Sequence, residues 1–146
     1  ISRWHELQTG QTVQLDGREV RAEDVHGAAR RGLRMVYATD TRPVESIVTE
    51  GHGADLMILE GMYGDESKRA QALANHHMLF AEAAELAKRA EAKRLVLTHF
   101  STCIDDPEEY LPLARAVFEP TEAGKDGMQL SLAYPDSADD KTPPRG

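Results

Sequence analysis

The sequence predicts an α/β fold with a largely parallel sheet and helices packed against it. Three apolar runs of strand length, each closed by polar residues, lie at 33–40, 54–61 and 93–100. Helical segments separate these runs, and this alternation is typical of parallel sheets. The runs are apolar at nearly every position, so both faces of the sheet should be covered. The few helices of this chain suffice for one face.

The first part of the chain predicts a hairpin, a strand and a short helix. "TVQLDGREV", within 9–21, alternates around Asp16 and Gly17, a pair that suits a two-residue hairpin turn. "LRMVYATD" (33–40) then gives the first strand of the main sheet. A short helix is expected over 43–52, because proline opens that stretch and glycine ends it.

The middle of the chain predicts two further strands around a broken helical region. "ADLMILEG" (54–61) is the second strand, and "KRLVLTHF" (93–100) is the third. Residues 66–91 are helical in composition, with a break expected at "NHH" (75–77). After that break, apolar residues recur at three- and four-residue spacing and predict one buried helix face. They are Phe80, Ala83, Ala84, Ala87 and Ala90.

The last part predicts a helix, an edge strand and a tail. Pro107 opens the helix "PEEYLPLARAVF", whose first turn carries two acids, as the helix dipole favours. "MQLSLAYP" (128–135) alternates and predicts a last strand at the edge of the sheet. Residues 136–146 are polar and rich in proline, so we expect a disordered tail.

Composition limits the classes of function. The 146 residues are enough for one domain with a real core, and the net charge of −8 counts against a general affinity for nucleic acid. A single cysteine, Cys103, cannot form an internal disulfide, so a reducing, cytoplasmic location is expected. No apolar stretch of about 20 residues predicts a membrane span. The chain begins with Ile1 instead of Met, so we expect further sequence upstream.

Ionisable side chains follow each of the three strands. Asp40, Glu60 and His99 come at the carboxyl ends, and His77 lies at the helical break. Carboxyl ends of parallel strands meet at one edge of a sheet, where sites gather, so these groups should converge. Carboxylate and imidazole are ligands of zinc and manganese in hydrolytic sites.

Each of these residues also has a purely structural interpretation. Asp40 could hydrogen-bond the amides of its own turn, and Glu60 could be a solvated loop acid. His99 could be a hydrogen-bonded core histidine, and His77 could simply begin a helix. Their arrival together at neighbouring strand ends favours a shared site.

The same segments carry a resemblance to a known family. "YATDTRPVESIV", "GADLMILEGMYGD" and "HHMLFAEAAELAKRAEAKRLVLTHFS" resemble the C-terminal half of ribonuclease Z, and the similarity runs from about Leu7 to about Pro135. The resemblance implies the metallo-β-lactamase superfamily, in which ribonuclease Z trims the 3′ trailer of precursor tRNA. Residues 1–135 would then form the C-terminal half of an αββα sandwich, one mixed sheet with outer helices.

The resemblance also implies roles for the four polar residues. Asp40 matches the carboxylate that bridges two divalent metal ions, and His99 matches the last histidine ligand. The expected metal is zinc, with manganese as the alternative. Glu60 and His77 match a pair that assists proton transfer at the scissile phosphate. The resemblance further implies precursor tRNA as the substrate of the parent protein, a homodimer and no membrane partner.

The sequence departs from the family pattern in one large respect. It contains no H-x-H-x-D-H motif, which supplies most of the metal ligands in the superfamily. Asp40 and His99 alone leave two protein ligands, whereas a catalytic zinc has three. The remaining ligands are therefore expected on a missing N-terminal half or on a partner chain, and this fragment alone should be inactive.

Smaller departures surround the site. His77-Met78-Leu79 stands where many members have His-Ser-Thr, and "TCIDDPEEY" stands where many have an Arg-Tyr pair. We interpret Asp105 and Asp106 of this stretch as solvated acids that precede a helix. We interpret Cys103 as a small buried hydrophobic residue in preference to a soft metal ligand.

Two alternatives to the tRNA-processing interpretation stay open. The same fold could hydrolyse a small phosphodiester or another ester, which the acidic balance and the altered residues near the site favour slightly. The chain could also be a non-catalytic half-domain that associates with another chain through an exposed apolar sheet face.

Overall fold

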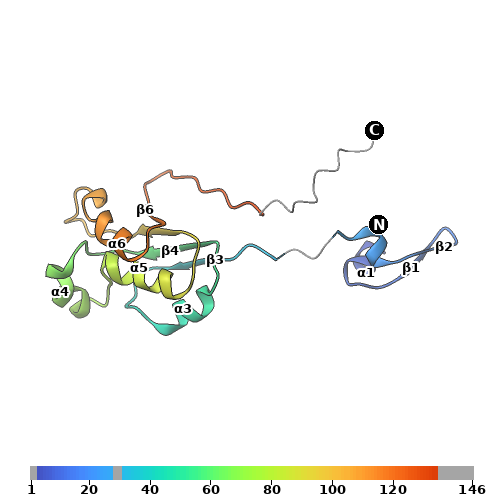
Figure 1. Ribbon diagram of the computed structural model, residues 1–146, viewed down its shortest axis with the longest axis horizontal. Coiled ribbons are helices and arrows are strands. Elements are labelled where there is room, and N and C mark those ends of the chain that lie inside the picture. Colours follow the sequence, from blue (N-terminus) through green and yellow to red (C-terminus); the bar gives the residue numbers. More distant parts are fainter. Residues whose placement is uncertain (1–2, 28–30, 135–146) are drawn as a thin grey trace. The chain divides into compact units, whose positions relative to one another are not determined.

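The computed structural model describes residues 3–27 and 31–134. They belong to two compact units, within 1–32 and within 33–146, which we describe one after the other (Figure 1). The predicted disordered tail, 136–146, lies outside the described residues.

The first unit is small and contains the predicted hairpin. Its elements are α1 (Trp4–Gln8), β1 (Val13–Leu15), β2 (Arg18–Val20) and α2 (Ala22–Val25). The two strands pair antiparallel, and the turn residues Asp16 and Gly17 both have positive φ, 49° and 76°. Two successive positive φ angles match the right-handed twist of the flanking strands, so the hairpin prediction is confirmed. Leu7 and Val13 are the buried apolar side chains of the unit's described part.

The second unit contains the predicted sheet. Its elements are β3 (Met35–Ala38), α3 (Glu45–Gly51), β4 (Leu56–Glu60), the 3₁₀ turn η1 (Glu66–Lys68), α4 (Arg69–Ala74), α5 (Phe80–Arg89), β5 (Leu95–Thr98), the 3₁₀ turn η2 (Pro107–Glu109), α6 (Leu111–Val117) and β6 (Thr121–Ala123). The strands lie in the order β3-β4-β5-β6 and every pair is parallel. The α/β class, with a sheet and outer helices, is confirmed.

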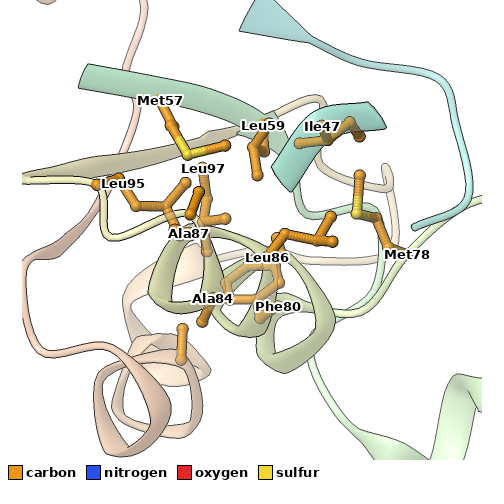
Figure 2. Packing of buried hydrophobic residues seen from close by; sticks show 14 of the residues in the cluster. Ile47, Met57, Leu59, Met78, Phe80, Ala84, Leu86, Ala87, Leu95 and Leu97 are labelled. Carbon is orange, nitrogen blue, oxygen red and sulfur yellow. The ribbon is translucent and has the colours of Figure 1, made fainter. Parts of the chain in front are cut away.

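One face of the sheet carries the hydrophobic core. Leu59 of β4 and Leu97 of β5 are fully buried and point at α5, as Figure 2 shows. α5 contributes Ala84 and Ala87 to the cluster, both fully buried, and Ala87 lies on the side of the helix toward the strands. Residues of α3 and α6 complete the same cluster. This layer fixes β3, β4 and β5 and hence the positions of their carboxyl ends.

The opposite face is less covered. Met35 and Tyr37 of β3 are 58% and 65% exposed, and their register partners on β4 place Ile58 on the same face. The strand predicted at 128–135 is wrong for its described part, since residues 124–134 form no strand. β6 takes the place beside β5 instead. Among the described residues, helices therefore cover one face of this sheet.

The helical break forms where "NHH" predicts it. α4 ends at Ala74, His76 has φ of 63°, and α5 begins at Phe80. A left-handed residue cannot continue an α-helix, so His77 is set in the connection between two helices. No helix within 3–27 or 31–134 has both the length and the apolar character to cross a membrane.

Candidate metal centre

Three strands deliver the predicted polar residues to one edge of the sheet. Glu60 is the last residue of β4, His99 follows β5 directly, and Asp40 comes two residues after β3. Asp40 and His99 both have left-handed backbone, with φ of 60° and 55°. This conformation is uncommon for residues other than glycine, and aspartate and histidine adopt it more readily than most. The left-handed backbone at Asp40 and His99 ends each strand sharply, next to the group that their side chains form.

Asp40, His77 and His99 form one group. Each offers a ligand atom, and the three atoms all lie within 4.8 Å of one another. Asp40 Oδ1 is 3.7 Å from His77 Nδ1, and the two imidazole rings have centroids 5.6 Å apart. The Asp40 side chain is 74% exposed, whereas His77 is half-buried. The expected convergence of these residues therefore occurs, and the group is open to solvent from the Asp40 side.

Glu60 supports this group from below. Its carboxylate is fully buried and accepts hydrogen bonds from the amides of Thr41 (2.5 Å) and Met78 (3.2 Å). Glu60 Oε2 also lies 3.1 Å from His77 Nδ1. The interpretation of Glu60 as a solvated loop acid is thus wrong. One buried carboxylate ties the loop after β3 to the loop that carries His77.

The local backbone explains how His77 reaches the sheet. Leu79 forms a parallel bridge with Tyr63, which lies just after β4. The Tyr63 amide donates to the Met78 carbonyl (3.4 Å), and the Phe80 amide donates to the Tyr63 carbonyl (3.0 Å). Gly61 makes room for this contact, because a Cβ there would lie 2.9 Å from Phe80 Cδ1. Residues 77–80 are therefore held against the end of β4.

A second carboxylate joins the same two loops. Glu82 of α5 accepts two hydrogen bonds of 2.8 Å from Arg42 and one of 2.9 Å from the Leu79 amide. The Arg42 guanidinium also donates to the His77 carbonyl, and Arg69 adds a bond to Glu82 at 3.0 Å. The sequence interpretation did not assign a role to Arg42 or Glu82. The "TDTRP" motif contains Arg42, but its partner lies 40 residues along the chain.

The charges around Glu82 keep it ionised. Burial disfavours its charged form, but the Arg42 hydrogen bonds, the Leu79 amide and the charges of Arg42 and Arg69 outweigh burial. Together they hold the pKa of Glu82 below its ordinary value. Glu82 also accepts from the amide of Leu79, the residue that precedes α5, and so satisfies a donor at the start of that helix.

The residues after His99 differ partly from expectation. Cys103 is exposed, so its prediction as a small buried hydrophobe is wrong. It lines a small cavity of about 110 Å³ with Tyr63, Ser101 and Tyr110 among others. Asp106 accepts a 3.0 Å hydrogen bond from the amide of Glu108, as a helix-leading acid does.

The donor set fits a divalent transition metal. Imidazole nitrogen and carboxylate oxygen are ligands that zinc and manganese accept, and three such atoms are already gathered. The buried Glu60 beside His77 adds an outer carboxylate, the arrangement that commonly orients a histidine next to a metal. The assignments of Asp40 and His99 as ligands, and of Glu60 and His77 as a proton-transfer pair, stay predictions.

Comparisons with known sequences point to one family. Residues 1–100 match the model of the β-lactamase superfamily domain. The chain is 43% identical to ribonuclease Z of Lachnoclostridium phytofermentans over 134 residues, which is 92% of this chain and 44% of that protein. It is 44% identical to ribonuclease Z of Clostridium acetobutylicum over 84% of this chain and 40% of that protein. The chain thus spans less than half the length of these relatives.

Solved structures of metallo-β-lactamase fold proteins also superpose on this chain. The metallo-β-lactamase fold protein YhfI of Bacillus subtilis superposes with a TM-score of 0.57 at 29% identity, over 64% of this chain and 38% of that one. The short form of human tRNase Z superposes with a TM-score of 0.56 at 26% identity, over 79% of this chain and 37% of that one. The strand-end site, the parallel sheet and these similarities agree: the chain belongs to the β-lactamase superfamily domain family and is a homologue of ribonuclease Z over part of that enzyme's length.

Proposed function

We propose that this chain is the C-terminal part of a metal-dependent phosphodiesterase of ribonuclease Z type, whose full-length form trims the 3′ end of precursor tRNA. The identity with proteins named ribonuclease Z supports the proposal. The structural observation that carries it is the gathering of Asp40, His77 and His99 above the buried Glu60 at one sheet edge.

In this proposal Asp40 and His99 are metal ligands, and the full-length parent holds two divalent cations. The proposed metal is zinc, with manganese as the alternative. The residues fit because one carboxylate, after β3, and one imidazole, after β5, reach the same point at the sheet edge from either side of β4. When bound, such cations neutralise phosphodiester charge and make hydroxide available near neutral pH. The ligands beyond this chain would come from an H-x-H-x-D-H segment.

His77 and Glu60 would form the proton-transfer pair. A carboxylate only accepts hydrogen bonds, so the 3.1 Å contact places the His77 proton on Nδ1, facing Glu60. The fixed imidazole can then exchange a proton through Nε2, and histidine is the side chain that most often serves as a general acid or base. Glu60 would act as a positioning residue, because its oxygens are buried and already bonded to backbone amides.

The open sheet face supports the expected partner, which is the segment or chain that carries the missing motif. Tyr37 and Met35 expose large apolar side chains there. A groove of about 340 Å³ continues this face between Ile58, Val96 and Met128 and reaches His99. A partner that packs on this face would thus arrive beside the metal centre. Exposed Cys103, for which the sequence offers no disulfide partner, supports a reducing, cytoplasmic setting.

Cleavage of precursor tRNA by the full-length parent tests the proposal. We expect Asp40→Asn and His99→Asn to abolish cleavage, since asparagine tolerates the left-handed backbone but removes the ligand. The control is Asp105→Asn, an exposed acid outside the group, which should retain activity. Full activity in both site variants would remove these residues from the chemistry. Preference for bis-p-nitrophenyl phosphate over precursor tRNA would favour a small-ester hydrolase.

Association tests the partner. The purified 146-residue chain should bind the separately expressed N-terminal region of the parent and restore cleavage. Tyr37→Glu should weaken that binding, because it places a charge on the open sheet face. Gel filtration of the parent tests the predicted homodimer.

A further inference from the structure

We propose that Arg42 is a positioning residue for the reaction at the sheet edge: it fixes where His77 stands relative to Asp40 and takes no part in binding the substrate. The inference rests on the proposed function, because positioning matters only where a reaction follows. Arg42 lies outside the three-residue group. Its side chain is 24% exposed, and both terminal nitrogens of the guanidinium donate within the fold.

The segment that carries His77 is held by side chains from other parts of the fold. Three consecutive residues of this segment each have one backbone group bound in this way: the His77 carbonyl by Arg42, the Met78 amide by Glu60 at 3.2 Å, and the Leu79 amide by Glu82 at 2.9 Å. The segment lies between two helices, so its position depends on these contacts and on its bridge to Tyr63. Arg42 is the donor among the three side chains.

Arg42 is itself fixed in direction. Its two terminal nitrogens donate to the two carboxylate oxygens of Glu82, each at 2.8 Å. A forked pair of this kind constrains angle as well as distance. Arg69 adds a further hydrogen bond of 3.0 Å to the same carboxylate. The guanidinium is therefore aimed at the His77 carbonyl by α5 and is not free to turn toward solvent.

Arg42 also stands close to Asp40 in the chain. Thr41, between them, donates its amide to the buried Glu60 at 2.5 Å. The loop at 40–42 and the segment that carries His77 thus share their anchors, and the Asp40 and His77 side chains approach to 3.7 Å. A misplacement of about 1 Å in an active site can lower the rate by about 100-fold. Loss of the direct link between loop and segment should therefore slow the reaction.

The first experiment measures kcat and KM for precursor tRNA in the full-length parent. Arg42→Ala should lower kcat by about 10- to 100-fold and leave KM within about twofold, because it disturbs geometry and removes no substrate contact. Arg42→Lys keeps the charge but not the fork, so it should recover part of kcat. The matched control is Arg89→Ala, which removes an arginine–glutamate pair with Glu45 at the far end of α5 and should retain kcat. Where circular dichroism shows that Arg42→Ala does not fold, Arg42→Lys carries the test.

The second experiment reads position without catalysis. NMR relaxation of the 146-residue chain gives backbone order parameters, which describe the folded state and do not depend on overall stability. In Arg42→Ala the values at His77 and Met78 should fall from about 0.85, that of rigid backbone, toward about 0.6. Residues of β5 should keep their values. Arg89→Ala should leave the values at His77 and Met78 unchanged.

The outcomes separate this inference from the proposed function. If Arg42→Ala keeps kcat, the inference is wrong, and the proposed ligands Asp40 and His99 are judged by their own variants. If KM rises while kcat holds, Arg42 binds substrate and the inference is wrong. If kcat falls but the order parameters at His77 and Met78 do not, Arg42 acts in another way and the inference is overturned. If the unaltered parent cleaves no precursor tRNA, the proposed substrate fails, and the same kcat comparison on bis-p-nitrophenyl phosphate decides the inference.

Discussion

Arg42 and Glu82 face each other with two parallel hydrogen bonds of 2.8 Å, and both side chains are mostly shielded from solvent. Such a forked pair is stronger and more directional than a single ion pair. Here it joins the loop that carries Asp40 to the first turn of α5. The geometry of the candidate site therefore depends on a residue pair outside the three-residue group.

Arg42→Ala should destabilise the chain by about 2–3 kcal/mol, because it leaves the Glu82 carboxylate short of its main partner. Urea unfolding measures the change. Arg42→Lys keeps the charge but not the fork, so it should recover only part of the loss. The control is Arg89→Ala, which breaks a solvent-exposed pair with Glu45 and should cost less than about 1 kcal/mol. Equal losses at both arginines would contradict this account.

Stability should fall in acid through Glu82. The pKa of Glu82 is lower in the folded chain than its ordinary value of 4.5, so the unfolded chain binds the proton more readily. The contribution is therefore complete above about pH 4.5 and is lost as the pH falls through the folded pKa. Urea unfolding from about pH 7 down to about pH 3 should show a shallower acid decline in Glu82→Gln. Identical slopes in the two proteins would count against the Arg42 pairing.

Glu60→Gln should destabilise the chain although the two side chains have nearly the same shape. The carboxylate accepts from Thr41, Met78 and His77, whereas an amide NH₂ would meet donors with a donor. The expected cost is about 1–3 kcal/mol in the free energy of unfolding. Glu85→Gln, at an exposed position of α5, should change stability by less than about 0.5 kcal/mol. A neutral result at both positions would show that Glu60 is not held as described.

Cys103 should react with a thiol reagent in the folded chain. Its side chain is exposed beside the small cavity next to Tyr110, so no unfolding is needed for access. The rate of reaction with Ellman's reagent should be similar in the native and the urea-unfolded protein. Protection by more than about tenfold in the native protein would show the thiol to be covered.

Local sequence signals predicted most of the second unit. The apolar runs, the proline and glycine boundaries and the "NHH" break each depend on neighbouring residues, and each matches an element or its end. The predicted convergence of Asp40, Glu60 and His99 followed from topology alone, because parallel strands end at a common edge.

The failures concern features set by distant residues. Met128 and Leu130 alternate like a strand, but β6 already occupies the place beside β5, and both residues line the groove near His99 instead. Burial of Glu60 depends on amides at Thr41 and Met78, which no pattern around Glu60 reveals. The partner of Arg42 is Glu82 of α5, 40 residues along the chain, so residues near Arg42 could not predict the pair. Side-chain partners across the fold are thus what the sequence does not predict.

The left-handed backbone at Asp40 and His99 has an evolutionary consequence. Glycine adopts this conformation without steric penalty, so Asp40→Gly or His99→Gly would relieve local strain at little cost in thermostability. A laboratory selection for heat resistance alone would tolerate, or even enrich, glycine at both places. Under the proposed function, every such gain would erase a donor atom.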